Sequence, residues 1–358
     1  MQSMKPFHLD DFTQENDFKF FIQLGNQQGD FLMHRHEDFC EAVIVTDGSA
    51  LHIVEDESYP VNRGDVFVIS GNTSHGFQNA KDFKPCNIMF DPAFFSASAQ
   101  ELVKTPGFQA LFVVEPNLAQ KSGGFRAKLK LSPEDYETAY GTICDMFNEQ
   151  ALKMSCWKTK FKTDFLSLCI HLSRCYENGS SHKNSDLYSI AEALAQIEKG
   201  YLSDLSVTEL ARLSNYSQRQ FLRIFKNICG CTPTEYIRKR RIKDACRMLR
   251  SSPEPITRIA AECGYSDSNY FSRAFKAETG LTPKSYRHQV RAPAPMSLTH
   301  QDFAQTNNTS PPSPEGRQVR APAPMSPTHQ DFAQTSNTSP PSPEGRQVRA
   351  PAPMSPTP

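Results

Sequence analysis

Three histidines and one glutamate near the N-terminus have a spacing that could build a metal or ligand site. They form the pattern His34-x-His36-x4-Glu41, and His75 follows later in the chain. Three imidazoles and one carboxylate suit Mn, Fe, Ni, Cu or Zn, because these ions accept nitrogen and oxygen ligands. Without a metal, the same groups could hydrogen-bond a small polar molecule or satisfy one another inside the protein. These three interpretations stay open at the level of the sequence.

The chain around these residues is expected to form short β-strands. Apolar residues alternate with period two in EAVIVTDGSALHIV and SYPVNRGDVFVIS, and turn signals such as Asp47-Gly48 separate the runs. His34 and His36 would share one strand face, whereas Glu41 needs a bulge or bend to join them. We therefore interpret residues 1–130 as a β-rich domain that contains a candidate ligand pocket. Its candidate effector pocket consists of His34, His36, Glu41, His52 and His75, and all of these except His52 are candidate metal ligands.

A helical segment is expected next. From residue 131 apolar residues recur with helical spacing, and Ser132-Pro133-Glu134-Asp135 supplies an N-cap, a first-turn proline and an early acid. A second helix is predicted over about residues 158–176, and the polar residues after it are typical of a linker. We interpret residues 131–185 as a helical dimerisation segment with its linker.

The charge distribution marks the C-terminal part as a nucleic-acid contact region. The whole chain is neutral, with 39 basic and 39 acidic side chains. Residues 201–288 alone contain 16 Lys and Arg against 8 Asp and Glu, a net charge of +8. A basic segment within a neutral chain is typical of a nucleic-acid-binding domain joined to a part with another role.

The basic segment contains one sequence pattern twice. Residues 211–217 (ARLSNYS) correspond to residues 260–266 (AAECGYS), and each run has a residue suited to positive φ, an aromatic side chain and a serine N-cap. Phe221-x-Arg223-x-Phe225-Lys226 corresponds to Phe271-x-Arg273-x-Phe275-Lys276. Two copies of helix, tight turn and helix are therefore expected within an all-α domain over residues 186–288.

Helix starts and small cores are predicted for both copies. Capping boxes are expected at Ser206-x-x-Glu209 and Ser217-x-x-Gln220, and a long helix over about residues 234–250 should join the copies. The predicted core residues are Leu210, Ala211, Leu213, Phe221, Ile224 and Phe225 in the first copy, and Ile256, Ile259, Ala260, Tyr270, Phe271, Ala274 and Phe275 in the second.

The other face of each second helix is the candidate DNA-reading surface. A recognition helix inserts its N-terminal turns into the major groove, where Arg can contact guanine and Asn or Gln can contact adenine. For Lys226, Lys276 and residues 238–241 we expect phosphate contact or plain solubility rather than base reading. The predicted DNA-binding residues are Gln218, Arg219, Leu222, Arg223, Lys226, Ser268, Asn269, Ser272, Arg273 and Lys276.

These motifs resemble those of the AraC/XylS family of transcription regulators. IAAECGYSDSNYFSRAFKAETGLTPKSYR is similar to the family signature, VTELARLSNYSQRQFLRIFKNICGCTPTEYIRKRRI is similar to its first unit, and the match covers about residues 186–288. The resemblance implies that both second helices enter successive major-groove turns on one face of the DNA. Asn215 departs from the family, which usually has glycine there, but asparagine tolerates the left-handed conformation. The resemblance places base contacts at Arg219, Leu222, Arg223, Asn269, Ser272 and Arg273.

The strand-rich part resembles the cupin domains that act as sensors in this family. The four candidate ligands match the two cupin motifs at the positions that bind metal in cupin enzymes. Ser70 and Asn72 depart from the proline and glycine that are usual in the second motif. FLMHRHEDFCEAVIVTDGSALHI looks most like the rhamnose-responsive members, which implies a small-molecule effector and suggests a sugar.

The last 70 residues are expected to be a disordered, proline-rich tail. QVRAPAPMS starts at Gln289, Gln318 and Gln347, a repeat of 29 residues, and residues 289–358 contain 15 of the 26 prolines. No signal peptide, membrane span or secreted-type cysteine framework is visible in the sequence, which favours a cytoplasmic protein with reduced thiols.

We therefore predict an α+β multidomain protein with a cupin-like β-barrel, a helical dimerisation segment, an all-α domain with two helix-turn-helix units, and a tail. We predict that a homodimer binds specific sequences of double-stranded DNA and that a small molecule controls this binding. We expect no enzymatic activity. RNA polymerase is a further expected partner, and a membrane is not. We expect that the protein requires no cofactor. The one bound group that the sequence suggests is a divalent transition metal in the barrel. The alternative is a cupin metalloenzyme fused to a DNA-binding module, which needs a bound metal with an open coordination site.

Overall fold

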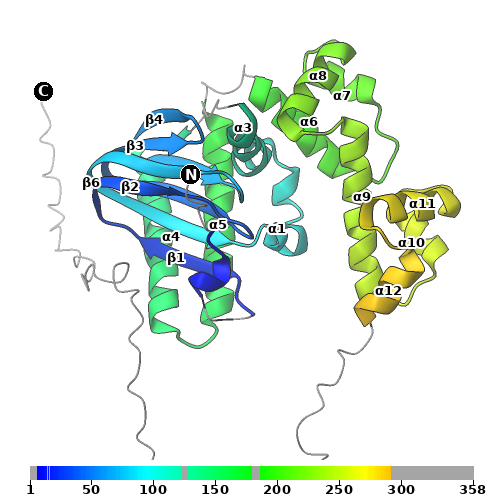
Figure 1. Cartoon of the computed structure of the whole chain (residues 1–358), viewed down its shortest axis with the longest axis horizontal. Helices are drawn as coiled ribbons and strands as arrows, with labels where there is room; N and C mark the ends of the chain where they lie inside the picture. The colour runs from blue at the N-terminus through cyan, green and yellow to red at the C-terminus, as the bar shows by residue number, and fades with distance from the viewer. Residues whose placement is uncertain (1–5, 14, 16, 123–127, 180–185, 292–358) are drawn as a thin grey trace, which may run out of the picture. The chain divides into compact units, whose positions relative to one another are not determined.

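The computed structural model describes residues 6–13, 15, 17–122, 128–179 and 186–291 (Figure 1). Most of the predicted linker lies outside these residues. The predicted disordered tail also lies outside them, except for residues 289–291, which belong to the last helix. That helix ends at Arg291, beyond the predicted domain boundary at residue 288.

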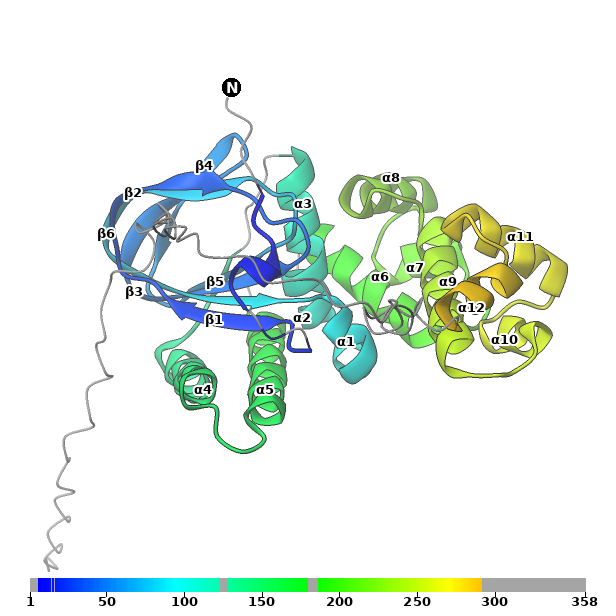
Figure 2. The same ribbon diagram turned by 60° about the horizontal axis from the view of Figure 1, so that its bottom comes forward.

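The strands form one curved antiparallel sheet. In the described residues seven strands are linked in the order β1-β6-β3-β5-β7, with β2 also paired to β6 and β4 to β3. Figure 2 shows the strands curling around a common interior, in agreement with the predicted cupin-like barrel. The strands are β1 (Phe20–Leu24), β2 (Gln27–His34), β3 (Cys40–Val54), β4 (Glu57–Asn62), β5 (Asp65–Ile69), β6 (His75–Phe90) and β7 (Leu129–Lys130).

The long strands β3 and β6 organise the barrel, and β3 is buried on both faces. Val43 and Val45 pack in an interior cluster with Phe67, whereas the alternate residues Ala42 and Ile44 belong to a second cluster. This two-sided burial explains why β3 reads as a nearly continuous apolar run. It also provides a rigid frame for side chains at the strand ends.

A glycine allows β3 and β6 to cross closely. Gly48 has a φ of +69°, and a Cβ at this position would lie 2.1 Å from the carbonyl oxygen of Asp82. The pairing register between the two strands shifts on either side of this point. Any side chain at position 48 would therefore displace the backbone of β6.

Short helices follow β6, within the part of the chain that was predicted to be β-rich and for which no helices were predicted. Phe95 and Phe108 pack edge to face, and Phe108 stacks on Phe112 with ring centroids 4.9 Å apart. Phe95 also packs edge to face on Phe90 of β6, so these aromatic contacts attach the segment to the sheet. The elements are α1 (Ala93–Ser98), the 3-10 helix η2 (Leu102–Lys104), α2 (Pro106–Phe108), the π-helix η3 (Gln109–Val114) and α3 (Glu115–Ser122); the 3-10 helix η1 (Leu9–Asp11) precedes the sheet.

Two long helices then form a hairpin, α4 (Pro133–Leu152) and α5 (Trp157–Asn178), which Figures 1 and 2 show side by side. The predicted cap is confirmed, since the Ser132 hydroxyl accepts a hydrogen bond from the backbone N–H of Asp135 at 3.1 Å. Ile143 of α4 and Phe165 of α5 are buried in the same cluster as one face of β3. The hairpin therefore covers the outer face of the sheet.

The C-terminal part of the described chain is entirely helical. Two helix pairs of the same construction, α7–α8 and α10–α11, are joined by the long helix α9. The helices are α6 (Asp186–Gly200), α7 (Val207–Leu213), α8 (Gln218–Cys229), α9 (Pro233–Ser251), α10 (Ile256–Glu262), α11 (Ser268–Thr279) and α12 (Pro283–Arg291).

Of the predicted caps in this part, one is confirmed and two are wrong. Ser217 and Gln220 form the capping box of α8. Ser206 begins α7 without a side-chain hydrogen bond, although its backbone is extended as in a cap. The N-cap of α11 is Asp267 rather than Ser266, because the carboxylate is the stronger acceptor for a helix N–H group.

Two predicted core residues are exposed instead. Leu213, at the last position of α7, is 44% exposed, and Tyr270 is 52% exposed. Tyr270 and Phe271 are neighbours in α11, so they cannot both face the core of a helix pair, and Phe271 takes the buried position. The other predicted core residues are buried or packed against the two helical cores.

Candidate functional site

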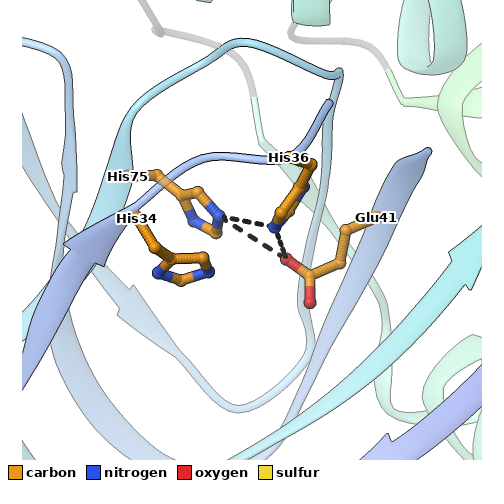
Figure 3. Close-up of side chains that lie close together, drawn as sticks. All are labelled: His34, His36, Glu41 and His75. Carbon is orange, nitrogen blue, oxygen red and sulfur yellow. Dashed lines mark hydrogen bonds and ion pairs between the residues drawn. The ribbon is translucent and has the colours of Figure 1, made fainter. Parts of the chain in front are cut away.

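The four candidate ligands come from separate elements of the barrel. His34 is the last residue of β2, Glu41 is the second residue of β3, and His75 begins β6. His36 lies in the connection between β2 and β3, where the chain makes the bend that Glu41 needed. Figure 3 shows that the four side chains gather in one place.

The donor atoms are spaced nearly as they would be around one metal ion. Oε2 of Glu41 is 3.7 Å from Nε2 of both His36 and His75, and these two nitrogen atoms are 3.2 Å apart. Donor atoms of all four residues lie within 4.8 Å of one another. Two donors that bind one ion at about 2.1 Å are themselves about 3.0–3.4 Å apart. The arrangement is thus slightly wider than a metal-bound one.

Burial keeps this cluster uncharged near neutral pH. Desolvation, with a smaller contribution from His34, lowers the pKa of His36 to about 3. Desolvation also lowers the pKa of His75 well below its usual range and raises that of Glu41 to about 8. The contacts between the imidazoles and Glu41 are therefore polar contacts of neutral groups rather than ion pairs. A divalent cation would reverse this balance, because it binds the ionised carboxylate.

Two nitrogen atoms of the cluster are buried without a hydrogen-bond partner in the described part of the chain, Nδ1 of His36 and Nδ1 of His75. Leaving a buried polar atom unsatisfied costs about 1–3 kcal/mol. A metal bound by the Nε2 atoms would still leave both Nδ1 atoms without partners. The site therefore has hydrogen-bonding capacity for a polar ligand in addition to its metal donors.

His52 lies beside the cluster rather than in it. Its Nδ1 hydrogen-bonds to the hydroxyl of Tyr59, and its ring stacks on Phe77 with centroids 4.8 Å apart. The His52 and His75 ring centroids are 5.7 Å apart. Tyr59, which was not predicted from the sequence to lie here, is the direct cross-strand partner of His52 in the β3–β4 register.

The predicted DNA-binding residues lie on the accessible face of the second helix of each pair. The exposed ones are Gln218, Arg219, Arg223 and Lys226 on α8 and Asn269, Arg273 and Lys276 on α11. Leu222, Ser268 and Ser272 are half-buried. The neighbouring phenylalanines Phe221, Phe225, Phe271 and Phe275 are fully buried.

The arginines of this part divide into paired and unpaired groups. Arg238, Arg240, Arg247 and Arg258 form ion pairs with acidic side chains at 2.8–3.7 Å. In the described residues no acidic side chain pairs with Arg219, Arg223 or Arg273, nor with Lys226 or Lys276. The positive charge of α8 and α11 is therefore available to an anionic partner.

Arg240 and Arg241 have a structural role, and the prediction of phosphate contact or solubility for them is wrong. Arg240 is paired with Glu198 at 2.9 Å and with Asp244 at 2.8 Å, and its side chain is 15% exposed. Arg241 donates hydrogen bonds to the carbonyl oxygens of Tyr201, Ser203 and Gly264 at 2.6–2.8 Å. Both guanidinium groups are already satisfied by the protein.

The tight turns of both pairs adopt the left-handed conformation that the sequence predicts. Asn215 has a φ of 57°, so the turn forms despite the missing glycine. Gly264 has a φ of +79°, and a Cβ there would lie 2.5 Å from the carbonyl oxygen of Leu202. Glycine is therefore required in the second pair.

Known protein families match both parts of the chain. The cupin domain model matches residues 20–90, and a helix-turn-helix domain model matches residues 210–289. The HTH-type transcriptional activator RhaR of Escherichia coli O139:H28 is 28% identical over 280 residues, which cover 78% of this chain and 95% of that protein. RhaR of Yersinia pestis is 28% identical over 269 residues, covering 74% of this chain and 88% of its own length. The chain is therefore homologous over most of its length to the RhaR transcriptional activators, and it combines a cupin domain with a helix-turn-helix domain.

Solved structures of regulators resemble part of this chain. The DNA-binding domain of AdpA in complex with a target DNA is 27% identical and covers 29% of this chain and 94% of its own, with a TM-score of 0.28. A transcriptional regulator with an AraC-type DNA-binding domain from Chromobacterium violaceum is 28% identical. The match covers 30% of this chain and 95% of that one, also with a TM-score of 0.28. None of the helices within the described ranges has the length and apolarity that a membrane span requires.

Proposed function

We propose that this chain is a transcription regulator that binds specific sequences of double-stranded DNA through α8 and α11. The observation that carries the proposal is the repeated surface of the two helices. In each, an arginine and a lysine three residues apart, Arg223 with Lys226 and Arg273 with Lys276, are exposed and lack acidic partners in the described residues.

The chemistry of these side chains suits major-groove recognition. A guanidinium group can bond both O6 and N7 of guanine, and an amide such as that of Asn269 can bond adenine in the same way. The lysines one turn later are placed to bind phosphates, which holds the helix in register without reading sequence. Two reading helices would contact two neighbouring turns of one duplex.

We further propose that the barrel senses a small polar molecule, with a sugar as the expected class. The unsatisfied Nδ1 atoms of His36 and His75 support this proposal, since they would hydrogen-bond hydroxyl groups. The kinship with RhaR regulators supports it independently. The effector would then alter how two subunits pair through α4 and α5, and so whether both DNA-binding domains reach their half-sites together.

A divalent transition metal is the second candidate ligand of the barrel. His34, His36, Glu41 and His75 would hold it, and the donor spacing of 3.2–3.7 Å favours this possibility. The ion would supply Lewis-acid polarisation of an oxygen ligand. We assign the metal no catalytic step, because the relatives are transcription regulators. We propose the same role for this chain, in the cytoplasm and with RNA polymerase as a partner.

Selection from random double-stranded DNA tests the proposed function. The purified chain should enrich a bipartite sequence, and addition of a sugar panel or of Zn²⁺, Mn²⁺ or Ni²⁺ should change the enrichment or the affinity. The His36→Ala variant should keep the sequence preference and lose the response. If no sequence is enriched under any condition, the proposal of a DNA-binding regulator is wrong. If a sequence is enriched but neither sugars nor metal ions change the result, only the proposal of a sensor is wrong.

A further inference from the structure

A second group of metal-binding side chains lies on the helical hairpin. Asp135 is in the first turn of α4, and His171 and Cys175 are one turn apart on α5. Figure 1 shows the start of α4 beside the second half of α5, as in any antiparallel hairpin. The three residues provide one oxygen, one nitrogen and one sulfur donor, and none of them belongs to the barrel cluster.

The donor atoms of the three residues lie close together, with His171 between the other two. Nε2 of His171 is 3.6 Å from Sγ of Cys175 and 3.8 Å from Oδ1 of Asp135. All three donor atoms lie within 4.8 Å of one another.

This spacing fits zinc. Zinc binds sulfur at about 2.3 Å and imidazole nitrogen at about 2.0–2.1 Å, so in tetrahedral geometry the two donors are about 3.6 Å apart. The observed distance between Nε2 of His171 and Sγ of Cys175 is also 3.6 Å. The spacing of four residues also keeps both side chains on one face of α5.

The surroundings of the three donor atoms favour an ion that enters from solvent. The side chains of His171 and Asp135 are 23% and 40% exposed. The Ser132 hydroxyl donates to Oδ2 of Asp135 at 2.6 Å, which fixes the carboxylate and leaves Oδ1 toward His171. Such an outer hydrogen bond is the usual way in which proteins orient a metal ligand.

We propose that Asp135, His171 and Cys175 bind a zinc ion that fastens the start of α4 to the last turns of α5. The Cys175 thiol loses its proton to the solvent when the Zn–S bond forms. His171 turns its Nε2 from the backbone carbonyl of Asp135, 3.0 Å away, to the ion. Because α5 precedes the DNA-binding helices in the chain, the ion would stabilise the hairpin end nearest to them in sequence.

Cobalt substitution separates this site from the barrel. Co²⁺ bound to a thiolate has a near-ultraviolet charge-transfer band, and the four barrel donors include no cysteine. The full-length protein, freed of metal and kept reduced by a phosphine, is titrated with Co²⁺ and then with Zn²⁺. We expect the band to develop with one equivalent at this site and to disappear when Zn²⁺ displaces Co²⁺.

Variants assign the band to the proposed zinc site. Cys175→Ser should abolish it and His171→Gln should weaken it strongly, whereas Cys156→Ser, at an exposed cysteine, and His36→Ala, in the barrel, should leave it intact. Zn²⁺ should also raise the Tm of the His36→Ala protein but not that of a His36→Ala/His171→Gln double variant. A reduced protein without the band, or a band that persists in folded Cys175→Ser, would overturn the proposal.

Discussion

At the scale of single residues, the arginines of the basic segment differ in whether their charge is free to bind an anionic partner or is already bound within the protein. Arg240 and Arg241 are saturated by side chains and carbonyl oxygens within the protein. Arg223 and Arg273 are exposed and have no acidic partner in the described residues. Composition alone cannot make this distinction, since all four belong to one basic segment. The positions of acidic residues in the folded chain decide it.

The Lys276→Ala variant should weaken binding to all DNA sequences alike. Lys276 is exposed near the end of α11, beyond the turns that would enter the groove. Loss of one phosphate contact should reduce the slope of log affinity against log salt by about 1. Titrations at several salt concentrations measure the slope. A change of base preference with an unaltered slope would assign Lys276 to base reading instead.

Glu115 should make the stability of the protein fall as pH rises. Its Oε1 accepts a hydrogen bond from Tyr176 at 2.6 Å, and its Oε2 is buried without a partner among the described residues. Burial raises the pKa of Glu115 well above the ordinary value of 4.5. The native state therefore keeps a proton that the unfolded state loses. This contribution to stability is complete below pH 4.5 and is lost as pH rises through the higher native pKa.

The Glu115→Gln variant tests this effect, because it cannot ionise. Between about pH 5 and pH 8 the free energy of unfolding of the natural protein should fall more steeply than that of the variant. Denaturant titrations over this range measure both slopes. Parallel curves would show that Glu115 does not carry the native proton.

At the scale of elements, helix α9 joins the two helix pairs and fixes their spacing through its side-chain contacts. Arg241 donates to Tyr201 and Ser203, which lie before the first pair, and to Gly264 in the turn of the second. One side chain thus connects the flanks of both pairs. The spacing of the two reading helices should depend on it.

Arg241→Ala should destabilise the DNA-binding part by roughly 2–4 kcal/mol, because hydrogen bonds to charged groups contribute about 1.5–3 kcal/mol each and water replaces part of them. DNA affinity should fall even where the variant is still folded, since the two helices lose their fixed spacing. Lys243→Ala, an exposed position on the same helix, is the matched control. Equal stability and affinity of the two variants would exclude this positioning role.

The sequence predicted the strands, the hairpin and both helix pairs, because period and turn chemistry are local properties. Asn215 adopts the predicted left-handed turn for the same reason. The sequence did not predict the π-helix η3 or the exposure of Leu213 and Tyr270, since tertiary contacts decide these. In the barrel it identified the four clustered residues, whereas the separate place of His52 required the β3–β4 pairing.

At the scale of the whole molecule, the proposed sensor would act on the DNA-binding domains of two paired subunits. Two linked domains bind two half-sites with a high effective concentration, so a small change in subunit geometry changes occupancy strongly. The effector should therefore alter the affinity for DNA with two half-sites and leave the affinity for a single half-site nearly unchanged. Fluorescence titrations with both DNAs measure this. An equal shift for both DNAs would contradict control through pairing.

The central claim is that α8 and α11 both read DNA, and substitution of their arginines tests it most directly. In titrations of the selected DNA, Arg223→Ala and Arg273→Ala should each weaken binding by roughly 1–3 kcal/mol, about 5- to 150-fold, and relax the preference for bases at separate positions. Arg258→Ala, which removes a 63%-exposed but ion-paired arginine, should bind as the natural protein does. Natural affinity and unchanged base preference in both helix variants would contradict the account.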